Sequence, residues 1–171
     1  MSALNCKLLV CGPAGAGKTT LVERISRDYD ASAFDVWTLV IDFLRRTGKA
    51  EIIGDELQQF YDDLIGNLPE SVDGILEISN DWPELFLDRI ITAFFWDHER
   101  KMLYVDALLE TSLQRVAQRE YPTPESTVRR QHEYSFDFYR SEADQRGIPI
   151  MCISGEAPFE EEYAKVGLFL D

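Results

Sequence analysis

Nine residues near the start of the chain combine glycines with a single cation, in the run Gly12-Pro-Ala-Gly-Ala-Gly-Lys-Thr-Thr20. The run matches the pattern G-x-x-x-x-G-K-[ST] at every position. Its glycines let the backbone wrap around a phosphate with successive N–H groups pointing inward. Lys18 is expected to reach the β- and γ-phosphates, and the Thr19 hydroxyl to bind Mg²⁺. The predicted contacts of a bound nucleoside triphosphate are Gly12, Ala14, Gly15, Ala16, Gly17, Lys18, Thr19 and Thr20.

The segments on either side of this run are those that a phosphate-binding loop needs. Leu4–Cys11 is a short apolar run that ends at glycine, which is typical of a buried strand. After the loop, Leu21, Val22 and Ile25 share one face of a predicted helix. The N-terminus of that helix adds partial positive charge beside the phosphate.

The rest of the chain alternates between helical spacing and apolar runs. Phe34, Trp37, Ile41 and Leu44 recur at helical spacing and predict one helix that ends before Gly48. Four further helices are predicted: one over Leu57–Leu68, one that starts at Asn80, one that contains Leu113 and Val116, and one long helix from Thr123 to Gly147. Further strands are predicted at Asp73–Ser79, Lys101–Asp106 and Ile148–Ser154. This alternation indicates an α/β fold of three layers, with a parallel sheet flanked by helices, in a single domain over residues 1–171.

The chain is acidic, with 31 carboxylates against 17 lysines and arginines and a formal net charge of −14. Such a charge repels nucleic acids and anionic membranes, so neither is an expected partner. The sequence has no run of about 18 apolar residues that could span a bilayer. Cys6, Cys11 and Cys152 lie in apolar runs without metal-ligand spacing, and we expect them to be buried and reduced. The expected location is the cytoplasm.

The loop alone would serve a switch, a motor or a kinase. A GTPase switch would carry an Asn-Lys-x-Asp segment that reads the base, and the sequence contains none. A motor ATPase typically has an apolar strand that runs into an Asp-Glu pair, whereas the second predicted apolar strand here runs through Leu76-Glu-Ile-Ser79. Neither of these two classes fits the sequence well.

Carboxylates and arginines are the remaining candidates for chemistry. Glu77 and Asp81 could hold Mg²⁺-bound water at the end of the second apolar strand, although Asp81 could equally cap the following helix. Four arginines lie within sixteen residues of one another: Arg115, Arg119, Arg129 and Arg130. They could close over a transferring phosphoryl group, or they could form an ordinary solvated helix face.

Five further segments carry motifs in a recognisable order: Gly48–Leu57, Asp73–Ser79, Tyr104–Ala107 followed by Arg115 and Arg119, Pro124–Tyr139, and Ser154–Pro158. In this order they resemble the adenylate kinase and nucleoside-monophosphate kinase family. The resemblance implies a kinase that uses ATP (or GTP) with Mg²⁺, acceptor-side helices over about residues 32–68 and a short lid over about 119–130. It also implies catalytic roles for Lys18, Arg115, Arg119 and Arg129, with Arg115 and Pro158 among the nucleotide contacts.

The acceptor side departs from that family. Where the family offers arginines to a monophosphate, this chain has Ser79-Asn-Asp-Trp-Pro83, and Asp35 and Trp37 precede it. An acidic, aromatic pocket suits a hydroxylated or cationic acceptor, so we expect nucleoside monophosphates to be poor substrates. Two functions remain open: a small-molecule kinase that acts on a nucleotide, nucleoside or related metabolite, and a nucleotide-binding regulatory module that recruits a protein partner with little or no phosphotransfer.

Overall fold

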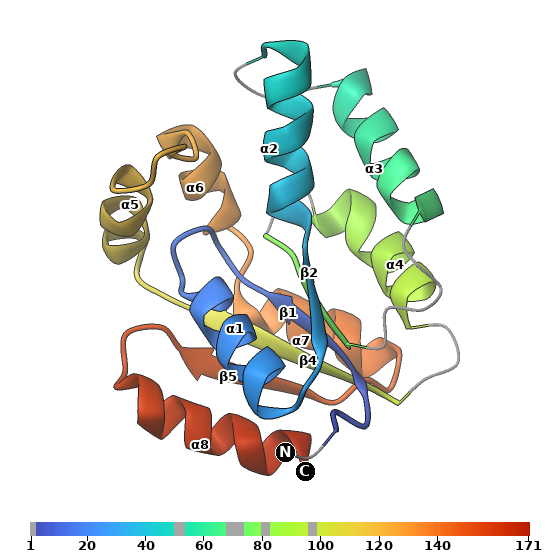
Figure 1. Ribbon diagram of the computed structural model, residues 1–171, viewed down its shortest axis with the longest axis vertical. Helices are drawn as coiled ribbons and strands as arrows, with labels where there is room; N and C mark the ends of the chain where they lie inside the picture. The colour runs from blue at the N-terminus through green and yellow to red at the C-terminus, as the bar shows by residue number, and fades with distance from the viewer. Residues whose placement is uncertain (1–2, 50–53, 68–73, 80–82, 96–98) are drawn as a thin grey trace.

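The centre of the molecule is a sheet of five parallel strands in the order β2-β3-β1-β4-β5 (Figure 1). The computed structural model describes residues 3–49, 54–67, 74–79, 83–95 and 99–171. The strands are β1 (Lys7–Cys11), β2 (Ser32–Asp35), β3 (Gly74–Glu77), β4 (Arg100–Asp106) and β5 (Ile150–Ser154). Because β1 has β3 on one side and β4 on the other, the direction of winding reverses there. The carboxyl ends of strands at such a reversal are where α/β sheets bind ligands.

Helices cover both faces of the sheet. On one face, α1 (Lys18–Asp28) and α8 (Phe159–Leu170) pack against Leu8 and Val10. On the other face, α3 (Asp55–Asn67), α4 (Pro83–Phe94) and α7 (Phe136–Gln145) share a core with Leu9 and Cys11. The alternation of these four β1 residues follows from the pleat of a strand, which turns successive side chains to opposite faces. Figure 1 shows α1 and α8 in front of the sheet and α7 behind it, which confirms the predicted three layers.

Three more helices lie near the carboxyl ends of the strands. They are α2 (Val36–Thr47), α5 (Leu109–Ala117) and α6 (Glu125–Gln131). Val116 of α5 and Val128 of α6 form a small apolar cluster with Ala14, so both helices rest on the loop after β1. On the opposite side, α2 lies next to α3 (Figure 1). The Arg45 guanidinium of α2 also lies over the Tyr121 ring, 4.7 Å from its centroid, in the segment that joins α5 to α6.

The predicted helix that starts at Phe34 is a strand followed by a helix, so this prediction was wrong for residues before Val36. In β2, Phe34 pairs in register with Leu76, and Asp35 with Glu77. A strand of four residues at the edge of a sheet is too short to show a clear alternation, and its Phe34 falls into the helical spacing of α2 by chance. The end of the helix was predicted correctly, since Gly48 follows Thr47 in the left-handed conformation.

The predicted long helix over residues 123–147 is also two elements, α6 and α7, and the segment 132–135 separates them. The Tyr104 hydroxyl of β4 donates a hydrogen bond to the Tyr134 carbonyl at 2.8 Å, which holds this connecting segment onto the sheet. No glycine or proline marks the break in the sequence, so only the tertiary contact reveals it. Helix α8 had not been predicted, although Phe159, Tyr163, Val166 and Leu170 have helical spacing.

Two further expectations concern the cysteines and membrane-spanning segments. Cys6 and Cys11 are buried and free, as expected, but Cys152 is exposed. The expectation was wrong for Cys152 because β5 is an edge strand, which has a neighbouring strand on one side only. In the part of the chain that the structure describes, every helix is too short or too polar to cross a membrane.

Candidate active site

The predicted phosphate-binding loop joins β1 to α1, and its path requires glycine. Gly12 has a φ of 142° and Gly15 a φ of 83°. A Cβ atom at Gly12 would lie 2.3 Å from the Val105 carbonyl oxygen, and one at Gly15 would lie 2.6 Å from the Ser112 carbonyl oxygen. Any other residue would therefore push the loop away from β4 or α5. The loop is therefore held closely between these two elements.

Helix α1 begins at Lys18, directly after the loop. Within the described residues, no side chain caps its first turn, because the N-cap residue is Gly17. The first N–H groups of an uncapped helix, together with its dipole, form a favourable environment for a phosphate. Thr19 and Thr20 are exposed in this first turn, where the motif predicts contacts with a nucleotide.

Lys18 is buried at the centre of this region, with only 5% of its surface exposed. Its Nζ donates to the Pro13 carbonyl at 2.9 Å and to Ser79 Oγ at 3.4 Å. Burial lowers the pKa of Lys18, and the nearby Glu77 carboxylate opposes this shift. The ammonium group thus lies between the loop and the end of β3. A bound phosphate there would compensate for its lost hydration.

Thr19 and Glu77 together fit a hydrated Mg²⁺. Thr19 Oγ1 donates to Glu77 Oε1 at 2.8 Å. Burial raises the pKa of Glu77, with Lys18 opposing the shift, and Glu77 Oε2 is buried without a hydrogen-bond partner in the described residues. A buried carboxylate oxygen needs a donor, which a Mg²⁺-bound water would supply. Asp81, the other predicted metal residue, lies outside the described residues.

The described residues do not form a metal site built from protein ligands alone. In the described ranges, no group of three or more histidine, cysteine or carboxylate side chains could hold an ion. Mg²⁺ that acts on phosphates commonly has one or two protein ligands and takes the rest from the nucleotide and water. The pair Thr19 and Glu77 suits that kind of site.

Asp35 adds a second carboxylate beside Glu77. It ends β2 in register with Glu77 and caps α2, accepting hydrogen bonds from the Trp37 N–H at 2.8 Å and from Thr38 Oγ1 at 3.3 Å. Burial is the main cause of the pKa shifts of Lys18 and Glu77, and the charge of Asp35 raises both pKa values. Asp35 therefore lies beside Glu77 at the carboxyl ends of β2 and β3.

Arg115 joins the loop to the last part of the fold. Its guanidinium donates to the Gly15 carbonyl at 3.1 Å and to the Gly155 carbonyl at 2.9 Å. Gly155 follows β5, and Pro158 is the N-cap residue of α8 at the other end of the same short segment. The structure therefore connects Arg115 with both the loop and the segment that leads to Pro158, and the role of both residues in nucleotide binding stays a prediction.

The other two predicted catalytic arginines differ in position. Arg119 follows α5, and its positive charge contributes, after burial, to the lowered pKa of Lys18. Arg129 instead pairs with Glu125 one turn earlier on α6, with an N–O distance of 2.7 Å, and both side chains are exposed. The structure does not bring Arg129 to the loop, and its role in phosphoryl transfer stays a prediction.

Gln131 is a site residue that the sequence did not reveal. It is buried in α6, and its Oε1 accepts a hydrogen bond from the backbone N–H of Ala14 at 2.7 Å. The two residues are 117 positions apart, so no local pattern could have indicated the contact. This bond and the apolar cluster around Ala14 connect the predicted lid helix directly to the phosphate-binding loop.

Gln131→Leu should weaken nucleotide binding. The change leaves the Ala14 N–H buried without an acceptor, at a cost of about 1–3 kcal/mol that a less ordered loop would partly relieve. We expect roughly tenfold weaker binding of ATP·Mg²⁺ in calorimetric titrations. The control is Gln145→Leu, which changes an exposed glutamine of α7 and should leave the affinity unchanged. Unchanged affinity in Gln131→Leu would show that the loop does not need this bond.

Comparison with known proteins by sequence gives a limited match. No protein-family model matches the chain. A nucleoside-triphosphatase THEP1 of Thermococcus kodakarensis is 44% identical over 43 residues, which are 25% of this chain. The match spans only 24% of the length of that curated relative.

Comparison by structure covers nearly the whole chain. A sugar kinase from a Janibacter species has a TM-score of 0.68 at 15% identity, with 98% of this chain and 95% of that chain covered. A deoxyadenosine kinase from M. mycoides has a TM-score of 0.64 at 12% identity, with 96% and 97% covered. A shikimate kinase from Aquifex aeolicus has a TM-score of 0.56 at 17% identity, with 96% and 95% covered. This chain therefore has the fold of the P-loop kinases.

Proposed function

We propose that this protein is a kinase that transfers the γ-phosphoryl group of ATP to a hydroxyl group of a small molecule. One observation carries the proposal: Lys18, Thr19, Glu77 and Asp35 all lie at the carboxyl ends of the neighbouring strands β1, β3 and β2. Lys18 and Thr19 suit the donor phosphates, whereas Asp35 is a carboxylate on the side from which an acceptor would approach. A carboxylate repels a phosphate acceptor and attracts a hydroxyl, which can donate a hydrogen bond to it.

The residues have distinct roles in the proposed reaction. The acceptor oxygen attacks the γ-phosphorus and forms a new P–O bond, while the bond between the γ-phosphorus and the β–γ bridging oxygen breaks and ADP leaves. Asp35 accepts the proton of the acceptor hydroxyl. Lys18 stabilises negative charge on the phosphates, and Arg119 adds positive charge from the predicted lid. Mg²⁺ held through Thr19 and Glu77 would neutralise phosphate charge.

A screen of acceptors tests the proposal. ADP release would be followed with ATP·Mg²⁺ and, separately, GTP·Mg²⁺, against sugars, nucleosides, nucleotides and hydroxylated acids, and the product would be identified by mass spectrometry. The expected result is ADP release that depends on one class of hydroxylated acceptor and yields its phosphate ester. ADP release at the same rate with and without every acceptor would contradict the proposal.

Asp35→Asn separates the chemical role of this residue from its structural one. Asparagine caps a helix about as well as aspartate does, so the fold should be retained. It cannot accept the hydroxyl proton, and turnover should fall by about 10²–10⁴ with nearly unchanged nucleotide affinity. The measurement is the initial rate with the acceptor from the screen, beside Asp35→Ala, which also removes the cap. Full activity in Asp35→Asn would eliminate Asp35 as the base.

A second candidate is a nucleoside triphosphatase or regulatory module, in which water replaces the acceptor and the nucleotide-bound form recruits a protein partner. The partial match to a nucleoside-triphosphatase supports this alternative. The same assay distinguishes the two functions, because a triphosphatase releases inorganic phosphate without any acceptor, and a kinase transfers the phosphate to a product.

A further inference from the structure

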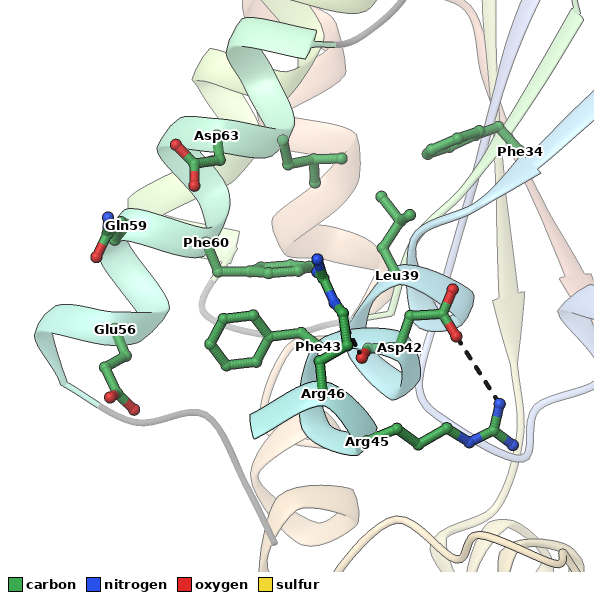
Figure 2. A pocket seen from close by; sticks show the side chains of 11 residues that line it. Phe34, Leu39, Asp42, Phe43, Arg45, Arg46, Glu56, Gln59, Phe60 and Asp63 are labelled. Carbon is green, nitrogen blue, oxygen red and sulfur yellow. Dashed lines mark hydrogen bonds and ion pairs between the residues drawn. The ribbon is translucent and has the colours of Figure 1, made fainter. Parts of the chain in front are cut away.

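A pocket of about 950 Å³ lies between α2 and α3 and has no role in the site described so far (Figure 2). Among its lining residues are Phe34 and Leu39, which precede and follow Asp35 in the sequence, and Asp35 is the N-cap residue of α2. From there it extends along α2 as far as Arg45 and Arg46. A pocket of this size can hold a whole small molecule. One end of such a molecule would lie near Asp35.

The floor of this α2–α3 pocket is apolar. Its apolar lining residues are Phe34, Leu39, Phe43, Phe60 and Leu64. The rings of Phe43 and Phe60 meet edge to face with their centroids 5.9 Å apart, and Figure 2 shows them side by side on facing helices. A flat or apolar body would bury its surface well against this floor, whereas a fully hydroxylated chain would lose hydrogen bonds to water there.

The rim of the pocket is charged. Its ionised side chains are Asp42, Arg45, Arg46, Glu56 and Asp63. Arg45 pairs with Asp42 at 3.8 Å, and Glu56 pairs with Lys49. Asp63 also interacts with another group of the molecule. These groups already have partners within the molecule, so they offer little to a ligand.

Arg46 differs from the other groups on the rim. In the described part of the chain it has no carboxylate partner, and its one hydrogen bond runs from Nε to the Asp42 carbonyl of its own helix at 3.4 Å. Figure 2 shows its side chain among the residues that line the pocket. Its two terminal nitrogens can therefore form the paired hydrogen bonds with which a guanidinium binds a carboxylate.

We propose that the α2–α3 pocket binds the body of the acceptor and that Arg46 binds a single carboxylate on it. This inference rests on the proposed function. The acceptor would carry its reactive hydroxyl near Asp35, a flat or apolar body on the floor and the carboxylate at Arg46. Helix α2 rises about 16 Å between Asp35 and Arg46. The Arg46 side chain points back along the helix toward Asp35, since its Nε reaches the Asp42 carbonyl.

The charge of the rim favours a carboxylate over a phosphate. The lining has three carboxylates, Asp42, Glu56 and Asp63, and two arginines, and Lys49 pairs with Glu56, so the positive and negative charges around the rim balance. A monoanionic carboxylate at Arg46 would meet one cation that has no carboxylate partner among the described residues, and it would meet little repulsion. A dianionic phosphate would bring a second negative charge that no further cation of the pocket lining balances. Nucleoside monophosphates should therefore bind less well than a carboxylate with a comparable body.

Two matched probes test the pocket without nucleotide: 4-(hydroxymethyl)benzoate and its neutral analogue 4-(hydroxymethyl)benzamide. Affinities would be measured by ligand-observed NMR with the full chain. In the wild type we expect the benzoate to bind about tenfold more tightly than the amide. Arg46→Met keeps the apolar stem of the side chain and removes the charge, so benzoate affinity should fall to that of the amide. The control is Arg100→Ala, which removes an exposed arginine at the start of β4, away from the carboxyl ends of the strands, and it should change neither affinity.

Failure of both probes to bind at millimolar concentration, or equal binding of the two probes, would overturn the inference. A preference for benzoate that survives in Arg46→Met would also overturn it. So would Arg46-dependent binding of AMP that is tighter than the binding of benzoate. Because these titrations contain no nucleotide, they are independent of phosphoryl transfer. Arg46-dependent benzoate binding in a protein that phosphorylates no acceptor would contradict the proposed function and leave the pocket assignment intact.

Discussion

Lys18→Ala should abolish most of the rise in melting temperature that ATP·Mg²⁺ or GTP·Mg²⁺ produces in the wild-type protein. Ligand binding to the folded state raises the melting temperature in proportion to the logarithm of the ligand-to-Kd ratio. Lys18 is the only cation of the loop and is buried against its backbone. Removing one partner of such a desolvated charge contact costs about 2 kcal/mol or more, so Kd should rise at least roughly thirtyfold.

The measurement is the difference between melting temperatures with and without nucleotide, determined for each variant separately. This difference corrects for any change in the stability of the unliganded protein. Lys165→Ala is the control, because Lys165 is exposed on α8 and pairs with Glu162 on that helix. If the shift in Lys18→Ala equalled that of the wild type, the nucleotide would bind elsewhere and the predicted contacts of the loop would be wrong.

Arg119→Ala should lower turnover far more than it lowers nucleotide affinity. After burial, the Arg119 charge contributes to the lowered pKa of Lys18, and Lys18 is the residue beside which negative charge on the phosphoryl group is expected to develop in the transition state. Arginines that contact the transferring group in other phosphoryl-transfer enzymes contribute about 10³–10⁵ in rate. We therefore expect kcat with the screened acceptor to fall by about a thousandfold or more, while Kd for ATP·Mg²⁺ changes little.

Two variants serve as comparisons for Arg119. Arg140→Ala removes an exposed arginine of α7 that pairs with Asp137, and it should have wild-type kinetics. Arg129→Ala tests the predicted role of Arg129, which must leave Glu125 to reach the phosphates and should therefore have a smaller effect than Arg119. Equal losses of affinity and turnover in Arg119→Ala would identify a contact to bound ATP rather than to the transition state.

The sequence alone determined the parts of the protein that depend on neighbouring residues. The phosphate-binding loop is a run of nine residues in which each position has a local role, and it lies between β1 and α1 as predicted. The strands β3, β4 and β5 and the helix α3 were predicted close to their observed bounds, since each is a run of apolar residues or a helical repeat. Glu77 was predicted from its place at a strand end, where the fold brings it to Thr19.

The tertiary structure alone decided the features that depend on contacts between distant segments. β2 exists as a strand because it pairs with β3, and this pairing puts Asp35 beside Glu77. The bond between Gln131 and the Ala14 N–H depends on packing of α6 onto the loop. The contact of the Arg45 guanidinium with the Tyr121 ring depends on how the segment between α5 and α6 packs beside α2. Local patterns report the conformation of a segment, but a side chain becomes a ligand, a cap or a base through what other segments place within hydrogen-bond distance of it.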